Sequence, residues 1–128
     1  MNSLFKKFTT KKVGKYKNKK TTINNIEFDS KDEAKFYEYL QYKYVAESII
    51  IQPKFELQPT FKYEHEKLKI RSINYIADFQ IGDCVFDVKG FQTTDFKIKA
   101  KLFKYKYPQL KLLVGTSKQL IQLMEGKL

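Results

Sequence analysis

Two apolar segments that carry charged side chains, separated by a glycine–aspartate pair, constrain the fold of this 128-residue chain more than any other feature. Their sequences are Y-I-A-D-F and F-D-V-K-G. The intervening Gly82-Asp83 pair is typical of a hairpin turn. In a hairpin that turns there, Asp78 and Asp87 lie within cross-strand reach, and strand alternation places Asp87 and Lys89 on one face. The sequence therefore predicts a hairpin on which two acids and a lysine gather.

The apolar neighbours of these charges make them chemically informative. Asp78 is flanked by Ala77 and Phe79, and a buried carboxylate is costly unless it is hydrogen-bonded, paired or bound to a metal. A carboxylate pair offers the oxygen ligands that Mg²⁺ prefers. An adjacent lysine can orient or help deprotonate a water and offset charge on a phosphate. We expect a Mg²⁺ site, with Mn²⁺ as a substitute, at Asp78 and Asp87. The alternatives are a structural hydrogen-bond network for the acids and a solvated Lys89.

The distribution of charge along the chain indicates a polyanionic partner. The formal net charge is +8 over residues 1–26, −4 over residues 27–96 and +7 over residues 97–128. Two basic ends thus flank an acidic middle, as expected for a lysine cradle around an acidic metal site. Such lysine arrays bind phosphate backbones without sequence preference. The alternative is that the lysines are solvated and only aid solubility, although a solubility surface normally mixes both signs.

Residue counts and apolar runs exclude several classes of protein. The chain has one cysteine and one histidine, so neither an internal disulfide nor a Cys/His metal cluster can form. No apolar run approaches ~18 residues, so we expect no membrane span, and the N-terminal segment lacks the apolar region of a secretory signal. We expect a flexible basic arm over residues 1–20 and a single domain over residues 21–128, in the reducing cytoplasm.

Apolar periodicity predicts an α/β fold with a mixed α+β sheet. A helix should follow Ser30, its N-cap, with Glu33 at the capping-box position. A second helix should cover residues 95–107 and stop at Pro108. The other expected elements are strands over residues 49–55, 57–63, 68–81, 84–88 and 110–115 and a short helix from Ser117. The predicted order is helix, antiparallel strands, helix, strand and helix.

Several polar residues outside the hairpin are candidate contacts to nucleic acid. Arg71, the only arginine, can clamp a phosphate through two hydrogen bonds or pair with an acid. Gln52 and Gln58 each precede a proline; we favour hydrogen bonding along strand edges for them, and contact with a phosphate or a metal-coordinated water is the alternative. The predicted nucleic-acid-binding residues are Lys11, Lys12, Lys15, Lys17, Lys19, Lys20, Arg71, Lys97, Lys101 and Lys104.

The hairpin residues resemble the P-D…(D/E)-x-K motif of the restriction-endonuclease-like nuclease superfamily, with Ala77 in place of the proline. The stretch from Phe28 to about Gly115 also resembles a family of small phage- and prophage-encoded proteins. Those proteins carry a similar Y-I-A-D-F…D-V-K-G-F pattern followed by a lysine-rich helix that ends in Y-K-Y-P. They are regarded as candidate endonucleases, with Holliday-junction resolution among the suggested roles. The resemblance implies a core of one helix, three antiparallel strands, a helix and a final strand.

The resemblance also implies roles for individual residues. Asp78 and Asp87 would be metal ligands and Lys89 the catalytic lysine. Glu33 matches the glutamate that the first helix of the superfamily often adds to the catalytic and metal-binding set, although a helix cap is the alternative. The implied activity is Mg²⁺-dependent hydrolysis of phosphodiester bonds in structured or branched DNA, within a bacterial host.

Two further expectations concern recognition and assembly. A chain with many lysines and one arginine favours recognition of DNA structure over sequence, because base readout relies on arginine contacts to guanine. A two-fold dimer would be the simplest way to cut both strands of a junction symmetrically. The alternative function is a non-catalytic DNA- or RNA-binding module that keeps the nuclease fold. The complete set of Asp78, Asp87 and Lys89 favours the enzyme.

Overall fold

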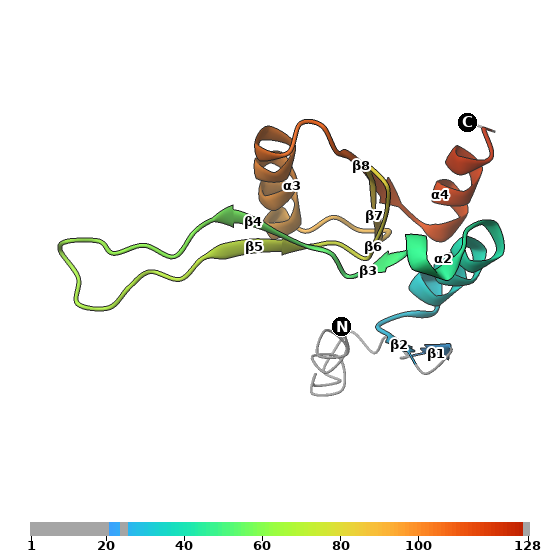
Figure 1. Cartoon of the computed structure of the whole chain (residues 1–128), viewed down its shortest axis with the longest axis horizontal. Coiled ribbons are helices and arrows are strands. Elements are labelled where there is room, and N and C mark those ends of the chain that lie inside the picture. The colour runs from blue at the N-terminus through green and yellow to red at the C-terminus, as the bar shows by residue number, and fades with distance from the viewer. Residues whose placement is uncertain (1–20, 24–25, 127–128) are drawn as a thin grey trace. The chain divides into compact units, whose positions relative to one another are not determined.

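The computed structural model describes residues 21–23 and 26–126 (Figure 1), which divide into two compact units. The first unit contains the described residues up to Ile49, together with Val88–Gly90 and the described residues from Val114 onward. The second unit contains Ile50–Asp87 and Phe91–Leu113. The predicted basic arm, residues 1–20, lies outside the described residues.

Two helices and a small hairpin make up most of the first unit. The strands β1 (Thr21–Ile23) and β2 (Ile26–Phe28) pair antiparallel, and α2 (Lys31–Lys43) follows them. A 3-10 turn, η1 (Ala46–Ser48), comes after α2, and α4 (Ser117–Met124) lies near the end of the chain. Ser30 caps α2, because its Oγ accepts a hydrogen bond from the Glu33 N–H at 3.2 Å. The predicted N-cap is therefore confirmed.

The two helices of the first unit are joined by polar contacts at both ends. At one end, Asp32 accepts hydrogen bonds from the N–H and the Oγ of Ser117, at 2.9 and 2.5 Å. At the other end, the Tyr39 hydroxyl donates to Glu125, and Lys43 Nζ lies 3.1 Å from the same carboxylate. The core between them contains Phe36, Leu40 and Leu120, each at most 2% exposed. Their burial supplies the main stabilisation of this helix pair.

A four-stranded sheet and a two-stranded hairpin run through the second unit. The four-stranded sheet has the order β3 (Ile50–Ile51), β6 (Phe79–Ile81), β7 (Cys84–Val88) and β8 (Lys111–Gly115). The hairpin pairs β4 (Lys54–Gln58) with β5 (Ile73–Ile76). Of the strands in the four-stranded sheet, β7 and β8 end in residues assigned to the first unit. The predicted mixed α+β fold is confirmed.

The hairpin of β6 and β7 forms where the sequence predicts it. Phe79 pairs with Phe86 and Ile81 with Cys84, which leaves Gly82-Asp83 as the loop. Gly82 has a φ of +58°, a conformation that glycine adopts without steric cost at the first position of a type II′ turn. The turn chemistry and the apolar strands therefore agree on one register.

The sheet is mixed because β8 runs parallel to β7. The N–H of Lys111 donates to the Asp83 carbonyl at 2.7 Å, just before β7 begins. The N–H of Lys89 donates to the Gly115 carbonyl at 2.8 Å, just after β7 ends. Both strands therefore progress in the same direction. A parallel pair needs a long crossover, and α3 (Thr94–Lys106) supplies it.

Three predicted strands are shorter in the structure than the sequence indicated. The segment 57–63 keeps strand structure only at Leu57 and Gln58, which end β4, and at the Phe61 bridge. The segment 49–55 is interrupted at Gln52, whose φ is +53°, and at Pro53, which has no N–H to donate. The segment 68–81 is divided into β5 and β6 at Ala77 and Asp78. Beyond β4 and β5 the hairpin continues through a bridge between Phe61 and Ile70, as the long green loop in Figure 1 shows.

Aromatic side chains form the core of the second unit beneath α3. Thr93 caps this helix by accepting a hydrogen bond from the Phe96 N–H at 3.1 Å. Phe103 is fully buried, and its ring centroid lies 4.8 Å from that of Phe55 and 5.5 Å from that of Tyr75. Such contacts between aromatic rings stabilise beyond the area they bury. The helix is therefore held against the hairpin by its apolar face.

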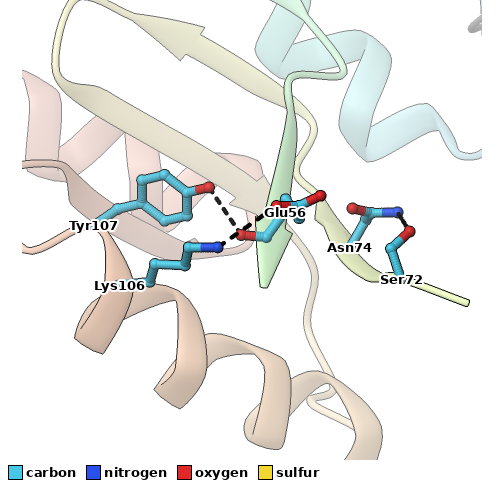
Figure 2. A network of polar contacts seen from close by, with 5 residues as sticks. All are labelled: Glu56, Ser72, Asn74, Lys106 and Tyr107. Atoms are coloured by element: carbon cyan, nitrogen blue, oxygen red, sulfur yellow. Dashed lines mark hydrogen bonds and ion pairs between the residues drawn. The ribbon is translucent and has the colours of Figure 1, made fainter. Parts of the chain in front are cut away.

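Polar contacts at the C-terminal end of α3 reinforce this packing (Figure 2). The Tyr107 hydroxyl donates to the Glu56 carbonyl oxygen at 2.8 Å, and Lys106 Nζ lies 3.8 Å from the Glu56 carboxylate. On the neighbouring strand, the Asn74 amide donates to Ser72 Oγ at 3.1 Å. Lys106 is therefore an ion-pair partner of β4 rather than a member of a purely solvated lysine face.

Candidate acid site

Asp87 is a buried carboxylate with a tyrosine as its hydrogen-bond donor. It lies on β7 with 3% of its surface exposed, and the Tyr75 hydroxyl on β5 donates to its Oδ2. Burial is the largest cause that raises the pKa of Tyr75 far above its usual value. The charge of Asp87, the hydrogen bond to it and the charge of Asp78 raise that pKa further. Tyr75 therefore remains a protonated donor to Asp87 over the whole physiological pH range.

Asp78 occupies an irregular position between β5 and β6. Its N–H donates to the Phe86 carbonyl at 3.0 Å, while the next residue, Phe79, is the register partner of the same Phe86. Two residues thus face one across the strand pair, which is the arrangement of a β-bulge. A bulge changes the direction of a side chain relative to regular alternation and is frequent beside active sites. The half-buried Asp78 is placed by this irregularity.

The two carboxylates lie near one another, because the Asp78 N–H donates to the carbonyl of Phe86, the residue before Asp87. Asp78 and Asp87 both raise the pKa of Tyr75, and both lie in the second unit. We call Tyr75, Asp78 and Asp87 the acid site. The two acids were expected from the sequence, whereas Tyr75 was not. The signal for Tyr75 was present in the Y-I-A-D-F pattern, three residues before Asp78.

Gln52 adjoins the acid site through the backbone. Its N–H donates to the Asp78 carbonyl at 2.9 Å, and its side chain is 7% exposed. Among the described residues, its Oε1 is the buried side-chain atom that has no hydrogen-bond partner. The unpaired oxygen costs about 1–3 kcal/mol, and the left-handed φ of +53° costs about 1–3 kcal/mol more. The backbone N–H of Gln52 therefore makes the expected strand-edge hydrogen bond, whereas the expectation is wrong for its Oε1.

The other two predicted catalytic residues belong to the first unit. Lys89 is half-buried and continues the backbone pairing of β7 beyond Val88. Glu33 is half-buried in the first turn of α2, and its N–H is bound by the Ser30 cap. Within residues 21–23 and 26–126, no group of three or more His, Cys, Asp or Glu side chains lies close enough to hold a metal ion. The metal roles of Asp78, Asp87 and Glu33, and the catalytic role of Lys89, stay predictions.

The predicted nucleic-acid contacts on α3 are exposed together. Lys97, Lys101 and Lys104 are all exposed and recur at the spacing of one helix face. Arg71 is also exposed, on the hairpin between the Ile70 bridge and β5. The predicted contacts of the basic arm lie outside the described residues: Lys11, Lys12, Lys15, Lys17, Lys19 and Lys20.

Comparison with protein families decides where the chain belongs. A family model described as a protein of unknown function, DUF1064, matches residues 13–120. The chain belongs to the DUF1064 family. Neither the curated proteins nor the solved structures contain a match to it.

The DUF1064 match covers the whole second unit and the acid site, and it covers the described part of the first unit up to Leu120. It includes Lys89, Glu33 and the lysines of α3, and it begins after Lys11 and Lys12. Across the described part of this DUF1064 protein, none of the helices has the length and apolar character needed to cross a membrane.

Proposed function

We propose that this protein is a Mg²⁺-dependent endodeoxyribonuclease that hydrolyses phosphodiester bonds in structured or branched DNA. One observation carries the proposal: Asp87 is buried, accepts a hydrogen bond from the Tyr75 hydroxyl, and directly follows Phe86, whose carbonyl pairs with the Asp78 N–H. Neighbouring carboxylates repel one another when both are ionised. A buried Asp87 near the half-buried Asp78 is expected in this strongly basic chain where a cation offsets that repulsion.

The residues of the acid site fit a hard divalent cation. Asp78 and Asp87 offer only oxygen ligands. Gln52 bonds to the Asp78 carbonyl through its N–H, and its buried Oε1 lacks a partner among the described residues. Oxygen donors of this kind suit Mg²⁺ and Mn²⁺ better than softer metals. A bound Mg²⁺ would supply Lewis acidity, because it lowers the pKa of coordinated water and offsets negative charge on a phosphate.

The protein groups have distinct roles in this proposal. Tyr75 orients Asp87 through a hydrogen bond that its raised pKa keeps intact, while Asp78 and Asp87 hold the cation. Lys89 would assist proton transfer from the attacking water and offset charge on the phosphate. Glu33 would add a further acidic ligand, as the resemblance to nucleases of the restriction-endonuclease type implies.

The basic surface provides the affinity for DNA. The exposed lysines of α3 form a phosphate-binding face, and the eight lysines of residues 1–26 add to it. With one arginine in the chain, bidentate readout of guanine is scarce, so DNA structure rather than sequence selects the substrate. A two-fold dimer on a four-way junction would cut both strands symmetrically.

The function is tested by incubating the full-length protein with labelled four-way junction, flap, duplex and single-stranded DNA. Each substrate is incubated with Mg²⁺, with Mn²⁺ and with EDTA. Cleavage that requires the cation and prefers a branched substrate supports the proposal. Binding to DNA or RNA without cleavage of any substrate would instead support the alternative, a non-catalytic binding module.

Replacing three lysines of α3 should weaken DNA binding through the loss of phosphate contacts. The triple variant Lys97→Gln, Lys101→Gln and Lys104→Gln should reduce the log–log salt slope on duplex DNA by about 2.7, at about 0.9 for each contact. The measurement is a series of gel-shift titrations at salt concentrations from about 50 to about 200 mM.

A matched triple variant provides the control for net charge. Lys31, Lys35 and Lys118 are exposed on α2 and α4, and their replacement by Gln removes the same charge. This control should reduce the slope clearly less than the α3 variant. Equal slopes for the two variants would show that α3 has no special part in binding DNA.

A further inference from the structure

Gln52 combines two unfavourable features at one position of the second unit. Its backbone φ is +53°, and among the described residues its buried Oε1 has no hydrogen-bond partner. Pro53 follows it, and a residue before a proline ordinarily adopts an extended conformation. Such features persist where the surrounding structure imposes them, and they cluster at ligand-binding sites. Because Oε1 is an acceptor, the missing partner is a donor or a cation.

The sheet register places Gln52 opposite Asp78 and near Asp87. We call these three residues the transverse row. Ile51 pairs with Phe79, and Phe79 pairs with Phe86. One step along β3 and β6, Gln52 lies opposite Asp78. The bulge places both Asp78 and Phe79 opposite Phe86, so Asp87, the next residue of β7, is offset from this pair by one position. The backbone bond from Gln52 to Asp78 at 2.9 Å shows that the pairing extends to this row. Neighbouring strands are about 4.8 Å apart, and Gln52, directly after β3, and Asp87, on β7, belong to the two strands that border β6 on either side of Asp78.

The side chains of the transverse row favour a cation as the missing partner of Gln52 Oε1. Two of its side chains are carboxylates, and the third presents a neutral oxygen. A carboxamide carbonyl alongside carboxylates is a common ligand set for hard divalent cations. We propose that Gln52 Oε1 is a third oxygen ligand for the divalent cation of the acid site. This inference rests on the proposed function, since it assigns a further ligand to the same site.

Isothermal titration of Mn²⁺ into the full-length protein tests the proposal without an activity assay. The variant Gln52→Met keeps the approximate volume of the side chain and removes its oxygen. The control Gln58→Met makes the same change at the other glutamine that precedes a proline. We expect Gln52→Met to bind Mn²⁺ at least about tenfold more weakly than the wild type and Gln58→Met to bind as the wild type does.

Thermal unfolding in EDTA separates a ligand from a structural residue. Removing an unpaired buried oxygen should leave the Tm of Gln52→Met equal to or above that of the wild type. The variant Gln52→Glu places a third carboxylate in the row, so it should lower the Tm in EDTA and tighten Mn²⁺ binding.

Three other results of these experiments would contradict the proposal. Wild-type Mn²⁺ affinity in Gln52→Met overturns this inference and leaves the proposed function intact. A Gln52→Met protein that unfolds or melts well below the wild type in EDTA also overturns it, because Gln52 would then be structural. Absence of Mn²⁺ binding by the wild type overturns the proposed function, and this inference with it.

Discussion

The substitution Asp87→Asn should abolish most Mg²⁺-dependent cleavage of DNA while the protein still binds its substrate. The amide keeps the shape of the side chain and can still accept the hydrogen bond of Tyr75, but it removes one negative ligand of the proposed cation. We expect a loss of about 10²–10³-fold in rate, the range found when one electrostatic group of a catalytic site is removed. The measurement is the cleavage of labelled junction DNA under single-turnover conditions.

Binding in EDTA should respond in the opposite direction. Without metal, Asp87→Asn should bind DNA as tightly as the wild type or more tightly, because the substitution deletes a carboxylate that repels the phosphate backbone. Its Tm in EDTA should also hold or rise, since neighbouring carboxylates repel one another without a cation. Gel shifts and thermal unfolding in EDTA measure these two effects.

Asp83→Asn is the matched control for this substitution. Asp83 is exposed in the turn of the same hairpin, so the same chemical change there should leave cleavage near the wild-type rate. Lys89→Ala should resemble Asp87→Asn in cleavage, because it removes the group proposed to assist the attacking water. Wild-type cleavage by Asp87→Asn or by Lys89→Ala would refute the proposed mechanism.

The substitution Phe103→Ala should lower the free energy of unfolding by about 3–5 kcal/mol, the usual range for truncation of a buried phenylalanine. Phe103 is fully buried, and its ring lies 4.8 Å from Phe55, 5.5 Å from Tyr75 and 5.3 Å from Tyr107. The cavity would remove packing from three elements at once and loosen the ring that bears the donor to Asp87. Urea denaturation followed by circular dichroism measures the change.

Tyr105→Ala serves as the control on the same helix. Tyr105 is 87% exposed, so its truncation should change the free energy of unfolding by less than about 0.5 kcal/mol. Phe103→Leu retains most of the apolar volume and should cost clearly less than Phe103→Ala. A cost below about 1 kcal/mol for Phe103→Ala would mean that this aromatic cluster does not hold α3 against the hairpin.

Local features of the structure could be predicted from the sequence because their causes are local. Ser30 and Thr93 cap their helices through bonds to residues three positions away, and such spacing is visible in a sequence. The turn at Gly82-Asp83 follows from glycine's access to positive φ and from the apolar strands on either side. The helix starts and the β6–β7 register therefore agree with prediction to within about one residue.

The sequence alone determined which two acids to examine, because Asp78 and Asp87 are charged residues within apolar strands, where an unpaired charge is costly. Only the tertiary structure decided what surrounds them. The Tyr75 hydroxyl reaches Asp87 across twelve positions of sequence, and the bulge at Asp78 depends on which carbonyl its N–H meets. Gln52 has a left-handed φ in a segment whose local preference is extended, and its Oε1 is unpaired among the described residues. These features arise from packing between distant segments, and tertiary contacts override local preference wherever their combined free energy exceeds its cost.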